Sequence, residues 1–258
     1  HAKAKDGNEA IHSLIGENML DSVKYLLSIG VDVDTHGKNN ITPLHQAVIF
    51  NHLDGAKMLL ENGANIKAAD NKGMTCLHFA RSEAMVDFLI TNGALVNSLS
   101  TDKTTPLHYA SNEEIATLLI YSKANLNVKD ADGSTPLHWA ASSRSDVAKA
   151  LIFAGANLNI KDSFGLTPLD YANEESKVVL SEHGAKLGSQ LVMLEYNLAN
   201  QELVILGVAG EIYAIEYSAD LRSWKKLTSV TTESARTVHK DNSSKNSAKR
   251  FYRLSFNN

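Results

Sequence analysis

The sequence predicts a mainly α-helical solenoid of six helix-turn-helix repeats, followed by a small all-β sandwich domain. Two observations predict this fold class. A four-residue segment of the type Thr-Pro-Leu-His recurs every 30 to 33 residues in the N-terminal part of the chain. After Gly188 that pattern stops, and short runs rich in Val, Ile, Tyr, Phe and Thr replace it. We therefore expect two domains, at residues 1–187 and 189–258.

The recurring segment sets the frame of the predicted repeats. Its copies begin at Thr42, Thr75, Thr105, Thr135 and Thr167. A Gly-Ala pair or its equivalent follows each of these threonines after 17 to 21 residues. Residues 9–34 fit the same frame without the Thr-Pro pair, which brings the number of predicted repeats to six.

Each repeat is interpreted as a turn followed by two helices. Thr can cap a helix with its hydroxyl, and Pro is tolerated at the first helical position because the N–H it lacks would have no intrahelical partner. A second helix follows, marked by apolar pairs such as Leu59-Leu60, and it ends at a Gly that can adopt a left-handed conformation. Asp and Gly between the repeats supply turn residues. Lys123 replaces the terminating Gly of its repeat, so we expect backbone strain there.

Short helix pairs cannot bury their apolar faces alone, so neighbouring repeats must stack into one core. With five near-matches to Thr-Pro-Leu-His, the chain resembles the ankyrin repeat family over about residues 4–187. The resemblance implies a solenoid that binds a protein partner on its concave face and turn tips.

Three features depart from the family pattern. The third, fourth and sixth repeats are three or four residues shorter between their helices than the repeat at Thr42, so we expect a shorter helix-helix loop there. Asn40 and Lys103 stand where other turns have Gly, and Asn tolerates that conformation better than Lys. Ser181 interrupts the apolar pair of the last repeat, as expected for a terminal repeat with a more polar outer face.

The C-terminal region predicts strands. Six candidate runs lie at residues 190–196, 202–208, 212–218, 224–231, 236–239 and 250–256, and this density predicts a sandwich. Segments within 207–224 and 250–253 resemble a fibronectin type III-like module found at the C-termini of bacterial surface or exported proteins. That resemblance implies an attachment or spacer domain and favours an exported location, periplasmic or at the cell surface, over the cytoplasm. The short linker between Ala185 and Gln190 predicts that the two domains dock.

Charge and hydropathy exclude some functions. Residues 189–258 hold nine Lys and Arg against seven Asp and Glu, and the residues before them hold 16 against 22. Neither part has the strongly basic character of a nucleic-acid-binding domain. No apolar run approaches the roughly 20 residues that a membrane-spanning helix needs. The single Cys76 excludes internal disulfides and any metal site built from several cysteines.

The residues that could carry chemistry favour structural roles. Four His residues recur in the repeats, but equivalent residues of stacked repeats lie roughly 8 to 10 Å apart, too far to share one metal ion. We expect each to bridge neighbouring turns instead; they are His45, His78, His108 and His138. Asp130-Ala131-Asp132-Gly133 looks like part of a calcium loop, but Val128 and Trp139 occupy the positions where further ligands would be needed. Cys76 has no resolving partner, so we expect a packed residue.

No nucleophile elbow, metalloprotease helix or phosphate-binding loop occurs in the chain. We therefore predict a non-catalytic protein without a metal, a nucleotide or another small-molecule cofactor, and we expect a monomer. Aromatic residues follow the fourth position of the recurring segment at Phe79, Tyr109, Trp139 and Tyr171. They are interpreted as packing between repeats, with a concave aromatic ladder as the alternative.

The resemblance to the ankyrin family implies that partners bind at the turn tips and the adjoining first helices. The candidates are therefore the turn tips and two residues of the first complete repeat, to which three of the aromatic residues are added. They are Lys38, Asn39, Ile41, Ile49, Phe50, Asn71, Lys72, Met74, Phe79, Thr101, Asp102, Thr104, Tyr109, Ala131, Asp132, Ser134, Trp139, Ser163, Phe164 and Leu166. Exposed Met74, Phe164 and Leu166 would be unusual on a surface without a ligand. The alternative for each is an ordinary solvated turn.

Two other functions stay open. The chain could bind glycans or attach to a surface through the β-sandwich, with Trp224, Tyr213 and Tyr252 as ligand-stacking residues, although these aromatics also suit a core. The chain could also be a structural spacer that binds nothing.

Overall fold

The computed structural model describes residues 10–188 with their side chains and, beyond them, the backbone of six strands between residues 193 and 256. The chain divides into two compact units, His1–Gly188 and Ser189–Asn258. The first unit holds the helices and the second holds the strands.

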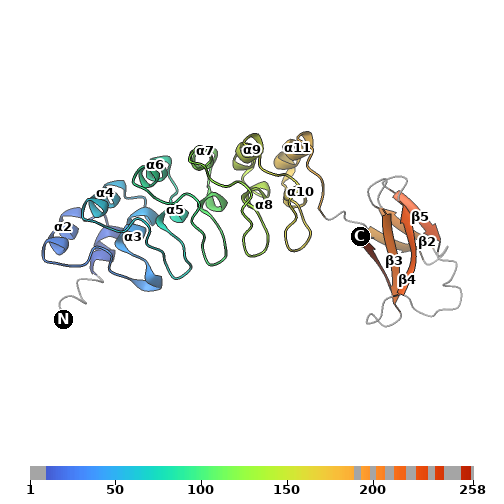
Figure 1. Cartoon of the computed structure of the whole chain (residues 1–258), viewed down its shortest axis with the longest axis horizontal. Coiled ribbons are helices and arrows are strands. Elements are labelled where there is room, and N and C mark those ends of the chain that lie inside the picture. Colours follow the sequence, from blue (N-terminus) through green and yellow to red (C-terminus); the bar gives the residue numbers. More distant parts are fainter. Residues whose placement is uncertain are drawn as a thin grey trace. The chain divides into compact units, whose positions relative to one another are not determined.

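Six helix pairs follow one another in the described part of the first unit (Figure 1). The first helices of the pairs are residues 10–16, α3 (Pro43–Ile49), α5 (Cys76–Phe79), the 3-10 helix η2 (Pro106–Tyr109), α8 (Pro136–Ala141) and α10 (Pro168–Tyr171). The second helices are α2 (Leu20–Ser28), α4 (Leu53–Glu61), α6 (Glu83–Thr91), α7 (Glu113–Tyr121), α9 (Ser145–Phe153) and α11 (Glu174–Glu182). Figure 1 shows the second helices side by side along one edge of this unit, with the turns projecting from the opposite edge. A further 3-10 helix, η1 (Lys38–Asn40), forms the first of these turns.

The helix boundaries follow from the capping residues. The Thr42 hydroxyl accepts a hydrogen bond from the His45 N–H, and Pro43 occupies the first helical position of α3. The terminating glycines adopt φ between 82° and 92°, a conformation that costs an L side chain about 1 to 2 kcal/mol; they are Gly30, Gly63, Gly93, Gly155 and Gly184. Lys123 adopts the same left-handed conformation, with φ of 69°, as does Lys103 in its turn, with φ of 59°. Asn40, the third position predicted to lack a glycine, is also left-handed, with φ of 62°. Lys123 therefore carries the expected strain.

The core runs without a break along the stack. Leu44, Leu59, Leu89, Leu119 and Leu151 are each buried within one continuous cluster that joins all the described repeats. Because each repeat contributes one face to the next, no repeat has a core of its own.

Two of the three shorter repeats differ from the prediction. The connection between the helices is three residues long in the second, third and fourth repeats, whereas α5 and η2 have four residues and α3 has seven. In the third and fourth repeats the missing residues therefore come from the last turn of the first helix and not from the loop. In the sixth repeat α10 also has four residues, but only two residues join it to α11, so the shorter loop expected there is confirmed. The backbone carbonyls that this lost turn leaves open must find donors elsewhere.

The second unit contains two antiparallel sheets. Its strands are β1 (Met193–Asn197), β2 (Glu202–Leu206), β3 (Ile212–Ser218), β4 (Lys225–Thr231), β5 (Arg236–Lys240) and β6 (Phe251–Phe256). One sheet has the order β1-β2-β5 and the other β4-β3-β6. Each strand overlaps one of the predicted runs. The sandwich packing and the fibronectin type III-like resemblance stay predictions.

Several predictions for this region fall on residues that are not described. Trp224 and residues 189–192 of the linker lie outside the described residues. The backbone of Tyr213 and Tyr252 lies in β3 and β6, but their side chains also lie outside the described part. Among the described residues, no helix has the length and apolar character needed to cross a membrane.

Candidate functional site

The turns between repeats share one hydrogen-bonded design. Asp130 Oδ1 accepts hydrogen bonds from the backbone N–H groups of Asp132 (3.0 Å) and Ser134 (2.8 Å). The Asp130 N–H donates in turn to the Ser134 carbonyl at 2.9 Å. Asp70 and Asp162 organise their turns in the same way. The shape of each turn is therefore set by its own residues, before any partner binds.

Neighbouring turns are joined by backbone hydrogen bonds. The Thr101 N–H donates to the Lys72 carbonyl at 2.7 Å, and the Ala131 N–H donates to the Asp102 carbonyl at 2.8 Å. Equivalent bonds join the Asn71 N–H to the Asn39 carbonyl and the Ser163 N–H to the Asp132 carbonyl. The turn tips consequently form one continuous row with a fixed spacing.

Most of the predicted turn-tip residues are exposed along this row. The exposed ones are Lys38, Asn39, Asn71, Lys72, Thr101, Asp102, Ala131, Asp132, Ser163 and Phe164. Phe164 is 73% exposed. Ile49 and Phe50 are also exposed, at the end of α3. We call the exposed turn tips together with Ile49 and Phe50 the turn face.

The exposure expected of Met74 and Leu166, each the last residue of its turn, was wrong. Met74, expected to be exposed, is 8% exposed, and Thr104 is also buried. Ile41, Ser134 and Leu166 are half-buried. These residues lie directly before the helix-capping Thr, where the chain turns inward, and their carbonyls accept hydrogen bonds from the preceding repeat. These hydrogen bonds link each turn to the repeat before it.

The recurring His residues bridge the repeats, as predicted. In the fourth repeat, His108 Nδ1 accepts a hydrogen bond from the Thr105 N–H at 3.0 Å. Its Nε2 lies 3.3 Å from the Ser134 carbonyl of the next turn, to which it donates as the neutral Nε2–H tautomer. His45, His78 and His138 reach the carbonyls of Met74, Thr104 and Leu166 in the same way.

Burial keeps these imidazoles neutral. It lowers the pKa of His108 to about 4 and lowers the pKa of His45, His78 and His138 below the ordinary value. Within residues 10–188 there is no group of three or more potential ligands that could hold a metal ion. Cys76 is fully buried, as expected for a packed residue, and burial raises the pKa of its thiol.

The aromatic residues that follow the recurring segment pack between repeats. Trp139 meets His108 of the preceding repeat edge to face, with ring centroids 5.7 Å apart. Phe79, Tyr109 and Tyr171 make the equivalent contact with the His of the repeat before each of them. None of the four side chains is fully buried. These four aromatic rings therefore pack between repeats and remain partly exposed.

Sequence reasoning missed a link between these aromatics and the turns. Trp139 Nε1 donates to Asp130 Oδ2 at 2.9 Å, and the Tyr171 hydroxyl donates to Asp162 Oδ2 at 2.7 Å. The hydrogen bond to Asp162 raises the pKa of Tyr171 to about 12. In both cases the carboxylate stands nine residues before the aromatic residue, a recurring spacing that could have revealed the link.

A cavity of about 380 Å³ opens between the turns of the fourth and fifth repeats. Its lining residues are Asp102, Thr104, Tyr109, Asp130, Ala131, Asp132 and Trp139. We call it the inter-turn hollow. It combines two aromatic rings with three carboxylates, and it lies on the turn face.

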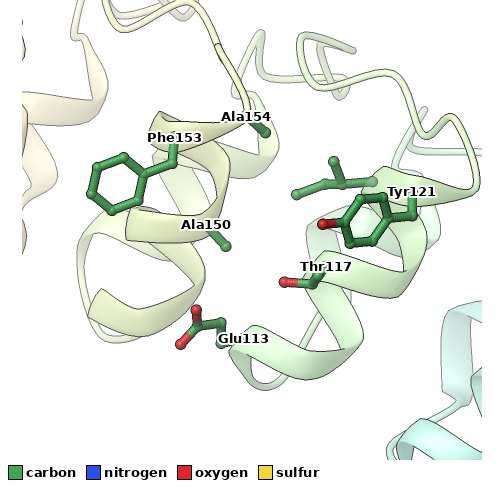
Figure 2. A pocket seen from close by; sticks show the side chains of 7 residues that line it. Glu113, Thr117, Tyr121, Ala150, Phe153 and Ala154 are labelled. Carbon is green, nitrogen blue, oxygen red and sulfur yellow. The ribbon is translucent and has the colours of Figure 1, made fainter.

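A second cavity of similar volume lies between α7 and α9, on the second helices (Figure 2). Ala150, Ala154 and Thr117 line it, and Tyr121 and Phe153 flank it with exposures of 78% and 73%. Figure 2 shows Tyr121 beside this cavity and Phe153 directed away from it, and the Phe153 ring meets His183 at 5.4 Å. This surface offers exposed aromatic residues away from the turn face.

The comparison with protein families agrees with the geometry. The family model described as Ankyrin repeats (3 copies) matches residues 1–70, 66–130 and 111–190, which together make up more than half of the chain. A search of the curated proteins finds no match. Ankyrin repeats generally mediate protein–protein interactions, and proteins built from them are typically non-catalytic interaction scaffolds. The stacked helix pairs, the bridging His residues and the family match agree, and the chain belongs to the ankyrin repeat family.

Proposed function

We propose that this protein is a non-catalytic scaffold that binds a protein partner along the turn face of its ankyrin solenoid. The observation that carries the proposal is the row of exposed turn tips, each shaped by its own hydrogen bonds and joined to the next by a backbone hydrogen bond. A surface that is ordered before binding loses little conformational entropy on association.

The chemistry of the turn face supports this role. Phe164 places an exposed aromatic ring at one turn tip, while Ile49 and Phe50 add apolar area at the other end of the row. Between them lie charged tips of both signs, such as Lys72 and Asp132. Aromatic anchors within a polar surround are typical of protein interfaces.

The test is capture with the full-length chain. The wild-type protein, Phe164→Ala and Lys72→Glu are immobilised separately, and proteins retained from an extract of the native host are quantified by mass spectrometry. We expect a retained partner whose recovery falls roughly tenfold or more in Phe164→Ala, as for an interface anchor. Tyr121→Ala is the matched control, because Tyr121 is an equally exposed aromatic residue on the second helices.

A partner that is lost with Tyr121→Ala but retained by Phe164→Ala and Lys72→Glu would place binding on the second helices and contradict the proposal. The alternative function, glycan binding by the C-terminal unit, is tested with the same full-length chain on a glycan array. That alternative requires binding that disappears in Trp224→Ala and survives Phe164→Ala.

A further inference from the structure

The inter-turn hollow has an aromatic floor that is held in place. The rings of Tyr109 and Trp139 lie with their centroids 5.3 Å apart and their planes at 72°. The indole is held by the hydrogen bond from Trp139 Nε1 to Asp130 Oδ2 and by the edge-to-face contact with the His108 ring. The floor therefore keeps its shape without a ligand.

The rim of the hollow carries carboxylates that have no partner. Asp102 and Asp132 are exposed, and neither side chain makes a hydrogen bond or ion pair within residues 10–188. Their turns are held together by the bond between the Ala131 N–H and the Asp102 carbonyl. Lys129, a nearby cation, is engaged elsewhere, since its Nζ donates to the Lys161 carbonyl at 2.8 Å. Two free negative charges therefore stand beside an aromatic floor.

The carboxylates and aromatic rings of the hollow together favour a positively charged occupant. Carboxylates repel an anion, and an uncharged apolar group would leave them without a counterion. The face of an indole attracts a cation. A metal ion is disfavoured because, among the described residues, no three of these side chains form a group that could hold one, and Asp130 already accepts hydrogen bonds from Trp139 and from its own turn.

The shape of the hollow selects among cations. A guanidinium is planar, stacks on aromatic rings and donates through several N–H groups to carboxylates, whereas an ammonium is a compact and strongly hydrated point charge. Here the carboxylates come from two different turns and the floor is formed by two rings. We propose that the inter-turn hollow receives the arginine side chain of a protein partner. This assignment rests on the proposed function and names one chemical feature of the partner.

The test uses the indole N–H of Trp139 as a reporter in the full-length chain. The protein has two tryptophans, so a ¹H–¹⁵N correlation spectrum contains two indole signals, and Trp139→Phe identifies the one to follow. The probe is N-acetyl-arginine amide, compared with N-acetyl-citrulline amide, which has the same shape without the charge. We expect a saturable shift of the Trp139 signal with arginine and little shift with citrulline.

The carboxylates are tested by the double variant Asp102→Asn and Asp132→Asn. We expect it to weaken arginine binding by roughly tenfold or more, because it removes both free charges and the charge-assisted hydrogen bonds that they would accept. The matched control is Asp21→Asn with Asp87→Asn, which removes the same charge from exposed positions on α2 and α6. This control should leave the arginine titration unchanged.

Three results would overturn the assignment: equal shifts with arginine and citrulline, an equal loss of binding in both double variants, or a stronger response to N-acetyl-lysine amide. The titration needs no partner, so it is independent of the capture experiment. If the indole signal does not respond while capture still depends on Phe164, only the arginine assignment fails. If capture is insensitive to the turn face while the indole responds, the proposed function fails instead.

Discussion

Asp170 Oδ2 accepts a hydrogen bond from the backbone N–H of Gly188 at 2.6 Å. Asp170 occupies the position that His fills in the four preceding repeats. Each of those His residues donates to a carbonyl of the next turn, but the last repeat has no following turn. Here residues 186–188 return to the stack and present an N–H group, and an acidic side chain is the matching acceptor.

Because Gly188 packs closely against the backbone of the last repeat, we predict that Gly188→Ala will destabilise this repeat. A Cβ at this position would clash with the Thr167 backbone nitrogen and lie 2.6 Å from the Gly165 carbonyl oxygen. We expect a loss of about 1 to 3 kcal/mol, as for overpacking of a core. Hydrogen exchange should show the loss as faster exchange confined to α10 and α11.

Gly16→Ala is the control for that variant, because a Cβ at Gly16 would meet its neighbours at ordinary distances of 3.4 Å or more. Equal protection of α10 and α11 in wild type and Gly188→Ala would contradict the interpretation.

Arg144 is expected to stabilise the shortened fourth repeat. Its Nη1 donates to the Ala110 carbonyl at 2.6 Å and to the His108 carbonyl at 3.2 Å, at the end of η2. Arg144→Ala would leave these carbonyls without that donor, and we expect it to lower the free energy of unfolding by about 1 to 3 kcal/mol. Urea unfolding measures the change. Arg81→Ala, at an exposed Arg before α6, should change stability by less than about 0.5 kcal/mol.

The buried His residues predict a loss of stability in mild acid. His108 has a folded pKa of about 4 against an ordinary value of 6.5, so between these pH values the unfolded chain binds more protons than the folded chain. Stability therefore falls as the pH decreases from 6.5 to 4, by an amount on the order of 3 kcal/mol for this residue. A protonated Nδ1 would also face the Thr105 N–H, another donor.

The measurement is the free energy of unfolding at pH 7.5 and pH 4.5. His108→Gln should be less stable at neutral pH but should lose less stability on acidification than the wild type. His183→Gln is the matched control, because it makes the same substitution at an exposed His outside the row of bridging His residues. If the stability of His108→Gln fell with decreasing pH as steeply as that of the wild type, other groups would be the cause of the acid sensitivity.

Lys123→Gly should stabilise the protein. Lys123 has φ of 69° at the position where the other second helices end in glycine. Relief of that strain is worth about 1 to 2 kcal/mol, of which the entropy of glycine in the unfolded chain removes about half, so we expect a net gain of about 0.5 to 1 kcal/mol. Lys67→Gly, outside the left-handed positions, should instead be neutral or destabilising, and thermal unfolding distinguishes the two variants.

Much of the solenoid could be predicted from the sequence, because the recurring Thr-Pro-Leu-His segment marks where each repeat begins. The bridging His residues, the strained Lys103 and Lys123 and the positions of the strands all followed from spacing and turn chemistry. The inward direction of Met74 was missed, because the turn pattern does not show which carbonyl the His of the previous repeat will reach. The role of Arg144 was missed because it joins residues of two repeats, 34 and 36 positions apart.

The order of residues along the turn face gives the row a polarity. Lys38 and Lys72 lie on the earlier turns, Asp102 and Asp132 on the middle ones and Phe164 on the last described turn. Consider an extended ligand with a cation between the middle turns and an apolar group beside Phe164. If the same ligand bound in the opposite direction, its apolar group would lie beside the lysines of the earlier turns. Such a surface distinguishes a peptide from the same peptide running backwards.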